Sequence, residues 1–154
     1  MPAIGIRSRA LVLLNELKSL SNPKAVEGMA HYGINPENTL GVSIPTIRAM
    51  AKRAGKNHEL AAELWASKIH GARILASMVD EPKRVTEEQM ECWVRDFDSW
   101  DVCDQVCMNL FEDTPFAYQK AVQRSARDIE TTNAVSCYHL MEVNALKLST
   151  LKPL

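Results

Sequence analysis

The sequence predicts an all-α fold, and three of its features lead to this prediction. Helix N-cap residues recur along the chain, and the apolar residues between them are spaced three and four apart. No stretch alternates between apolar and polar residues beside Gly or Asn-Gly turns, so no β-sheet is expected. The connections are short, which makes consecutive helices antiparallel neighbours. Such helix pairs occur in α-solenoids and in globular bundles, and the spacing alone does not distinguish the two.

Helix signals follow one another through the first half of the chain. The first helix is expected over residues 7–20, and its apolar stripe consists of Leu11, Leu13, Leu14, Leu17 and Leu20. The N-caps of the next helices are expected at Asn22, Ser43 and Asn57, and helix ends are expected at Gly33 and Gly55. A further helix is expected over residues 72–79.

The second half begins with a capping-box spacing. Thr86 and Gln89 stand three residues apart ahead of apolar positions, which predicts a helix start. Asp98 is the expected N-cap of the helix that contains residues 100–111.

The composition of the chain changes near residue 130. A helix is expected from Thr114 to Asp128, and a last one from about residue 131 to Leu146. We therefore divide the chain into a helical domain, residues 1–130, and a divergent C-terminal helix and tail, residues 131–154.

The bulk composition is that of an intracellular globular protein. Of the 154 residues, 46% are hydrophobic and 24% are charged, which is ordinary for one domain. No apolar run approaches the ~20 residues of a membrane-spanning helix. No cleavage site follows the basic N-terminus, so a cytoplasmic location is expected. The four cysteines form no C-x-x-C pair, so buried free thiols are expected and a metal site is not.

The charges are sorted along the chain although the net charge is only −1. Residues 44–56 carry bases and no acid, whereas residues 86–104 carry many acids and Arg95 as their one base. Two sets of bases share a helical spacing of three and four: Arg48, Lys52 and Lys56, and Lys120, Arg124 and Arg127. Each set forms one stripe, which fits either contact with the phosphates of duplex DNA or an ordinary solvated face.

Three parts of the sequence carry a resemblance to a known family. They are residues 29–33 (MAHYG) with 40–48 (LGVSIPTIR), residues 58–65 (HELAAELW) with 72–76 (ARILA), and residues 99–104 (SWDVCD) with 116–118 (FAY) and 125–128 (SARD). Together they resemble the DNA alkylation repair family, the AlkD-like HEAT-repeat glycosylases. The resemblance covers roughly residues 10–130.

This resemblance implies a fold, a partner and a reaction. The fold would be an α-solenoid, a superhelix of HEAT-like antiparallel helix pairs, and its concave face would hold double-stranded DNA containing alkylated bases. Family members excise purines alkylated at N3 or N7 without flipping the base into a pocket, unlike the general scheme for glycosylases. The tryptophan-x-x-x-aspartate motif that carries their catalysis corresponds to Trp100 and Asp104. Tyr32 would lie near the DNA-facing side, and no metal or cofactor is implied.

The chemistry fits these residue types at this spacing. Four residues make about one helical turn, so Trp100 and Asp104 share a face. An alkylated purine is already cationic and leaves without a general acid, whereas the sugar that remains becomes a cation that a carboxylate can stabilise. An indole beside a cationic nucleoside adds about 0.5–2 kcal/mol of cation–π attraction. Without the resemblance, Asp101 and Asp104 would be solvated surface acids, and Trp100 would be a core aromatic. Asp101 would then cap the helix or face water, and core packing is expected for Trp65 and Trp93.

The sequence departs from the family after about residue 130. Family members supply an arginine and a second tryptophan from their next helices, but residues 131–154 contain neither. This favours a truncated or divergent variant, and an exposed C-terminal end could associate with a second copy. The alternative to a glycosylase is a non-catalytic HEAT-repeat module that binds DNA or a protein partner.

Overall fold

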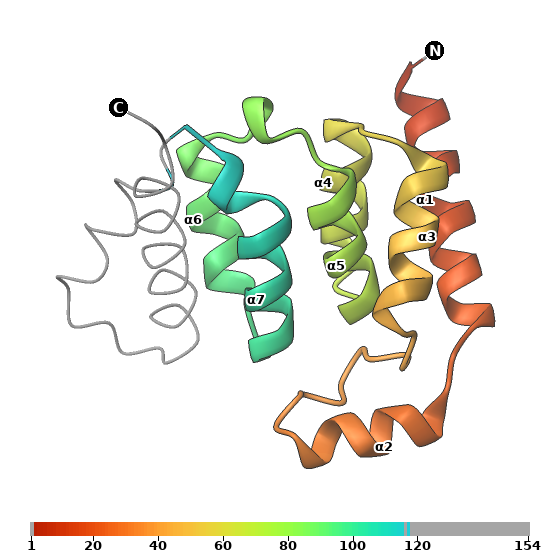
Figure 1. The fold of residues 1–154 in the computed structure, drawn as a ribbon. Helices are drawn as coiled ribbons and strands as arrows, with labels where there is room; N and C mark the ends of the chain where they lie inside the picture. The colour runs from red at the N-terminus through yellow and green to blue at the C-terminus, as the bar shows by residue number, and fades with distance from the viewer. Residues whose placement is uncertain (1, 116, 118–154) are drawn as a thin grey trace, which may run out of the picture. The chain divides into compact units, whose positions relative to one another are not determined.

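The structure is a computed structural model, and it describes residues 2–115 and residue 117. Within these residues the chain forms seven α-helices and two short 3-10 helices and no strand, which confirms the all-α prediction (Figure 1). In chain order they are α1 (Pro2–Ser19), α2 (Pro23–His31), α3 (Ile44–Ala54), α4 (His58–Ala66), α5 (His70–Val79), η1 (Pro82–Arg84), α6 (Glu87–Asp96), α7 (Trp100–Asn109) and η2 (Phe111–Asp113). None of the described helices is long and apolar enough to cross a membrane.

Local side-chain hydrogen bonds set most of the helix starts. Four of the predicted N-cap residues each accept a hydrogen bond from the backbone N–H three residues further on: Asn22 at 3.1 Å, Ser43 at 3.4 Å, Asn57 at 2.8 Å and Thr86 at 3.1 Å. These bonds satisfy N–H groups that have no partner inside the helix. Gly55 ends α3 with a φ of 75°, as predicted.

The predicted N-cap at Asp98 was wrong. The N-cap of α7 is Ser99, which directly precedes the first helical residue, and its side chain makes no capping hydrogen bond. Asp98 lies one position too early for its carboxylate to take the N-cap place.

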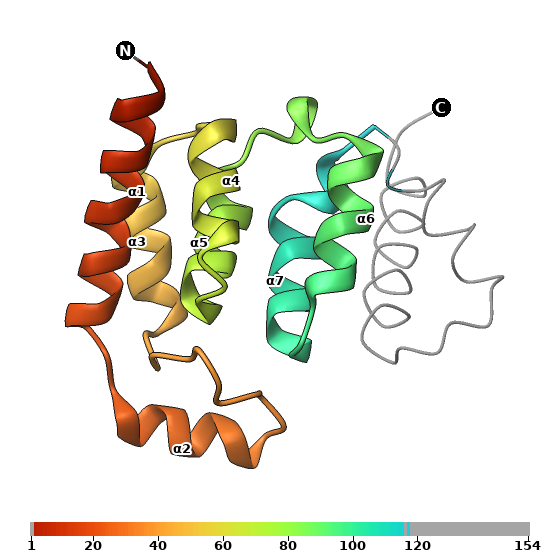
Figure 2. The same ribbon diagram turned by 180° about the vertical axis from the view of Figure 1, so that it is seen from behind.

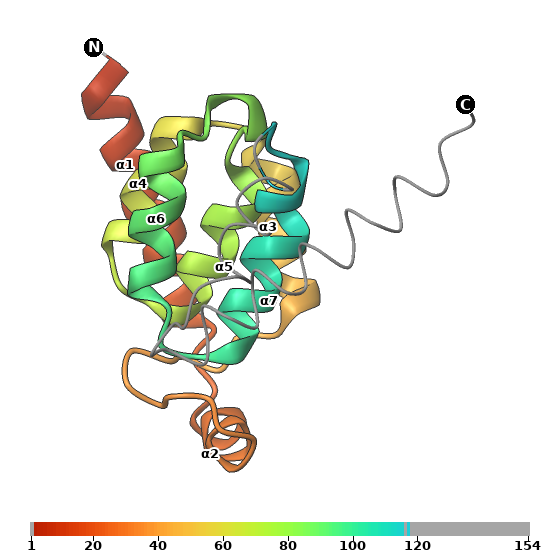
Figure 3. The same ribbon diagram turned by 90° about the vertical axis from the view of Figure 1, so that its left-hand side faces the viewer.

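The described residues divide into two compact units, and the boundary falls between Glu81 and Pro82. In the first unit α1 packs against α4, α3 packs against α5, and α4 packs against α5. Figure 3 shows α1 and α4 on one side of this unit and α3 and α5 on the other. The short link from α4 to α5 makes these two helices antiparallel (Figure 1). The paired arrangement within this unit agrees with the expected antiparallel helix pairs.

The core of the first unit lies between these four helices, and α2 lies apart from it. Its largest fully buried side chains are Leu17, Ile47, Met50, Leu60, Leu64, Ile74 and Leu75. Helix α2 contributes no buried residue and runs crosswise to the other helices of this unit (Figure 2). Gly41, in the loop before α3, lies close to the start of α2. A Cβ at this position would collide with the carbonyl oxygen of Asn22, so only glycine allows this close approach. The Gly41 φ of 79° also disfavours any other residue there.

The apolar stripe predicted for the first helix was only partly right. Leu17 is fully buried, as expected, but Leu11 is 59% exposed and Leu20 is 42% exposed. Helix α1 also begins earlier than predicted, at Pro2. Leucines occur on several sides of this helix, and only contact with α4 and α5 decides which side is buried.

In the second unit, α6, α7 and η2 each contribute buried apolar residues. The Trp93 and Phe111 rings lie 6.2 Å apart at an interplanar angle of 38°. Trp93 and, in the first unit, Trp65 are each 5% exposed, which confirms that both are core residues. The cysteine prediction was wrong in part: Cys103 is buried and free, but Cys92 is exposed and Cys107 is disulfide-bonded.

Candidate functional site

The predicted Trp-Asp pair lies at the start of α7. Trp100 is the first residue of this helix, and Asp104 follows one turn later on the same face. Trp100 is 47% exposed, so the alternative of a core aromatic is wrong for this tryptophan. Asp104 is half-buried, with apolar neighbours in sequence at Val102, Cys103 and Val106 that are buried.

The carboxylate of Asp104 has no hydrogen-bond or ion-pair partner among the described residues. Burial raises the pKa of this carboxyl group, and the neighbouring charge of Asp101 raises it further. Asp101 is itself half-buried, and its Oδ1 accepts a hydrogen bond of 2.8 Å from the backbone N–H of Val102. A desolvated carboxylate of this kind gains most from a positive charge brought beside it.

The thiol of Cys103, which precedes Asp104 in the chain, is unreactive at neutral pH. Burial raises the pKa of Cys103 to about 12, and the charge of Asp104 adds to the rise. The thiol therefore stays protonated at neutral pH and is a poor nucleophile.

The first basic stripe lines a depression on the surface of the first unit. The basic depression, as we call it, has a volume of about 430 Å³ and is lined by Arg48, Ala51, Lys52, Gly55, Lys56 and Met78. Arg48 and Lys52 are exposed, and neither has a hydrogen-bond or ion-pair partner in the described part of the chain. The Lys56 ammonium differs, because it donates a hydrogen bond of 2.8 Å to the backbone oxygen of Met78.

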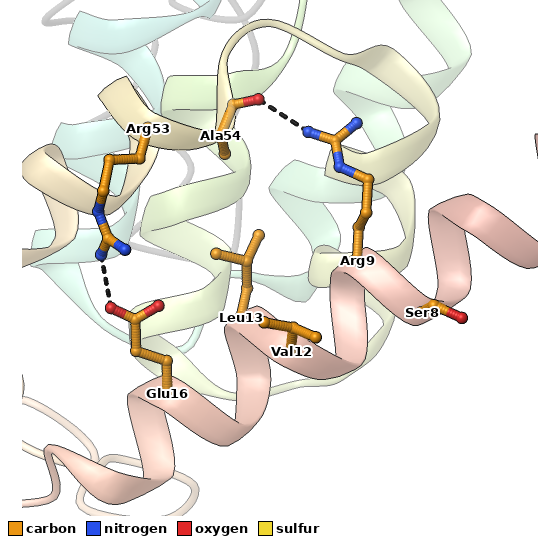
Figure 4. Close-up of a pocket in the computed structure, with 7 residues that line it drawn as sticks. All are labelled: Ser8, Arg9, Val12, Leu13, Glu16, Arg53 and Ala54. Atoms are coloured by element: carbon orange, nitrogen blue, oxygen red, sulfur yellow. Dashed lines mark hydrogen bonds and ion pairs between the residues drawn. The ribbon is translucent and has the colours of Figure 1, made fainter.

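The fourth base of this segment lies outside the basic depression. Arg53 pairs with Glu16 of α1 at the edge of a second groove, between α1 and α3, with a volume of about 360 Å³ (Figure 4). At the other edge of this groove, Arg9 donates a hydrogen bond of 2.8 Å to the backbone oxygen of Ala54. Helix α3 thus sorts its bases onto two faces.

The remaining predicted site residues lie away from these two sites or outside the described residues. Tyr32 is the C-cap of α2, in the first unit, and is 78% exposed. Lys120, Arg124 and Arg127, with the helices predicted after residue 115, lie outside the described residues, and their roles stay predictions. In the described part of the chain, no three or more His, Cys, Asp or Glu side chains gather as a metal site would require.

Sequence reasoning missed two features of these sites. It did not anticipate that Lys56 contacts α5, because Met78 lies 22 residues away along the chain. It also did not anticipate that the charge of Asp101 acts on Asp104, although three residues on a helix are close enough for two carboxylates to repel each other.

The described part of the chain is all-helical, with a partly exposed tryptophan, a half-buried carboxylate one turn later and, in the other unit, a basic depression. The comparison with protein families identifies the class of protein to which the chain belongs. The family model described as DNA alkylation repair enzyme matches residues 13–131, and the chain belongs to this family. A role in DNA repair follows. Neither a curated protein nor a solved structure matches the chain.

Proposed function

We propose that the protein is a DNA glycosylase that removes purines alkylated at N3 or N7 from double-stranded DNA. The observation that carries this proposal is the carboxylate of Asp104, which is half-buried and has no partner among the described residues. A carboxylate without a partner at this position costs stability unless a ligand supplies a compensating charge. Within the family, such a ligand is the sugar cation of a DNA lesion.

The bond that breaks joins C1′ of the deoxyribose to a ring nitrogen of the alkylated base. The base takes the bonding electrons and its positive charge is neutralised, so no general acid is needed. The sugar becomes an oxocarbenium-like cation, which the carboxylate of Asp104 stabilises. Water then attacks C1′ and loses a proton, which leaves an abasic site. The half-exposed indole of Trp100 contributes cation–π attraction to the charged nucleoside.

The electrostatics of Asp104 favour this role. Burial and Asp101 raise its pKa because both oppose the ionised form. A cation that develops beside the carboxylate favours the ionised form again. The interaction is therefore strongest in the transition state, which is the condition for faster chemistry.

The basic depression supplies a means of holding the DNA backbone. Arg48 and Lys52 are exposed cations with no partner in the described part of the chain, so a phosphate can contact them without breaking an existing ion pair. Binding through such contacts is independent of base sequence and weakens as salt rises. It positions the duplex, and the recognition of damage falls to the residues around Asp104.

The deciding experiment measures release of 7-methylguanine from alkylated duplex DNA under single-turnover conditions. Asp104→Asn keeps the shape of the side chain and removes its charge, so excision should fall by about 10²–10³ while DNA binding stays nearly intact. The matched control is Asp113→Asn, which removes an exposed acid of the same unit in η2. Equal losses in both variants would indicate a general charge effect. Inactivity of the unmodified protein would favour the non-catalytic DNA-binding module.

A further inference from the structure

The link between α3 and α4 is fastened to the end of α5 by four hydrogen bonds. Lys56 Nζ donates to the backbone oxygen of Met78 at 2.8 Å. The backbone N–H of Asn57, the next residue, donates to the backbone oxygen of Val79 at 2.7 Å. The last carbonyl groups of a helix have no partner within it, so these two donors cap the C-terminus of α5. The ammonium of Lys56 also suits the negative end of the helix dipole.

His58 supplies the other two bonds. Its Nδ1 lies 2.6 Å from Oδ1 of Asp80, and its backbone N–H donates to Oε2 of Glu81 at 3.1 Å. The side chain of Asp80 is 0% exposed, and the same Oδ1 accepts the backbone N–H of Glu81 at 2.7 Å. A buried carboxylate is costly to leave without its partners, so this contact resists opening.

We infer that Asp80, acting through His58, is a positioning residue that holds Lys56 in place for binding a DNA phosphate at the basic depression. This inference rests on the proposed function. Lys56 and Met78 both line the basic depression. The hydrogen-bonded residues Asn57 and His58 directly follow Lys56 in the chain, and their partners Val79 and Asp80 directly follow Met78. An ammonium group has three N–H donors, so the bond to Met78 leaves two for a phosphate.

The physical benefit is preorganisation. A free lysine side chain loses much rotational freedom when it binds a ligand, and this loss weakens binding. Lys56 has its ammonium held before the DNA arrives, whereas Arg48 and Lys52 have no such contact among the described residues. The three cations of the basic depression therefore differ, and Lys56 depends on residues that never touch the DNA.

A double-mutant cycle on DNA affinity tests this inference with the full chain and an undamaged duplex at about 0.1 M salt. Loss of one phosphate contact weakens binding roughly 8-fold at that salt concentration, which is the expected effect of Lys56→Ala. Asp80→Ala should weaken binding by a part of this factor in the native background. It should have no further effect in the Lys56→Ala background. Asp80→Asn should keep most of the affinity that Asp80→Ala loses, because the asparagine Oδ1 can still accept the His58 N–H.

Two further variants make every outcome decisive. His58→Ala removes a partly exposed side chain, and it replaces Asp80→Ala in the cycle if that variant does not fold. Arg48→Ala should weaken binding by the same factor with or without the Asp80 substitution. If the Asp80 and Lys56 effects simply multiply, or if Asp80→Ala leaves affinity unchanged, Asp80 has only a structural role and the inference fails. No DNA binding by the unmodified protein would instead refute the proposed function.

Discussion

The basic depression makes a quantitative prediction about salt. Arg48 and Lys52 have no partner in the described part of the chain, so their whole contribution to DNA binding is available as phosphate contacts. Each contact contributes about 0.9 to the slope of log affinity against log salt concentration. Replacing both residues by alanine should therefore reduce the slope by about 1.8.

This change in slope corresponds to a large difference in affinity. Between about 50 and 200 mM salt, the unmodified protein should lose roughly 12-fold more affinity than the double variant. Fluorescence anisotropy of a labelled duplex over this range gives both slopes. Lys56→Ala should add about 0.9 to the loss of slope, but it should also destabilise the fold by about 0.3–1 kcal/mol, because the C-terminus of α5 loses a cation.

Arg53→Ala is the matched control. It removes the same charge from the same helix, but Arg53 pairs with Glu16 in the other groove (Figure 4). Its slope should stay close to that of the unmodified protein. If Arg53→Ala reduced the slope as much as Arg48→Ala, only net charge would matter, and the basic depression would be an ordinary solvated face.

Three further predictions concern the Trp-Asp pair and the fold. Asp101→Asn should lower the pKa of Asp104. Excision needs the ionised carboxylate and rises with pH through this pKa, so the acid limb of the pH profile of excision should move to lower pH. An unmoved limb would show that Asp101 and Asp104 titrate independently. Trp100→Ala should slow excision by roughly 2- to 30-fold, the equivalent of about 0.5–2 kcal/mol, measured at saturating protein. Gly41→Ala should lower the free energy of unfolding by about 1–3 kcal/mol in thermal melts, whereas Gly28→Ala, which meets nothing within 4 Å inside α2, should not destabilise.

The sequence was most informative where the structure depends on neighbouring residues. Asn22, Ser43, Asn57 and Thr86 were predictable as N-caps because each bonds to a backbone N–H three residues away. The shared face of Trp100 and Asp104 was predictable for the same reason, since helical geometry alone produces it.

Contacts between distant residues were not predictable in this way. The exposure of Leu11 depends on where α4 and α5 pack, and the pairing of Arg53 with Glu16 depends on how α1 approaches α3. The bond from Lys56 to Met78 likewise joins two helix ends that a spacing pattern cannot bring together. The grouping of Arg48, Lys52 and Lys56 was thus predictable from their spacing, but the different contacts of the three side chains were not.

The different burial of the three tryptophans has a practical consequence. Trp65 and Trp93 are each 5% exposed, whereas Trp100 is 47% exposed. Trp100 is also the tryptophan of the Trp-Asp pair, one helical turn before Asp104. A soluble quencher such as acrylamide should therefore reach mainly one indole, and DNA seated against α7 would shield that indole. The unlabelled protein thus contains its own fluorescent reporter, which distinguishes a duplex held at the pair from one held only by the basic depression.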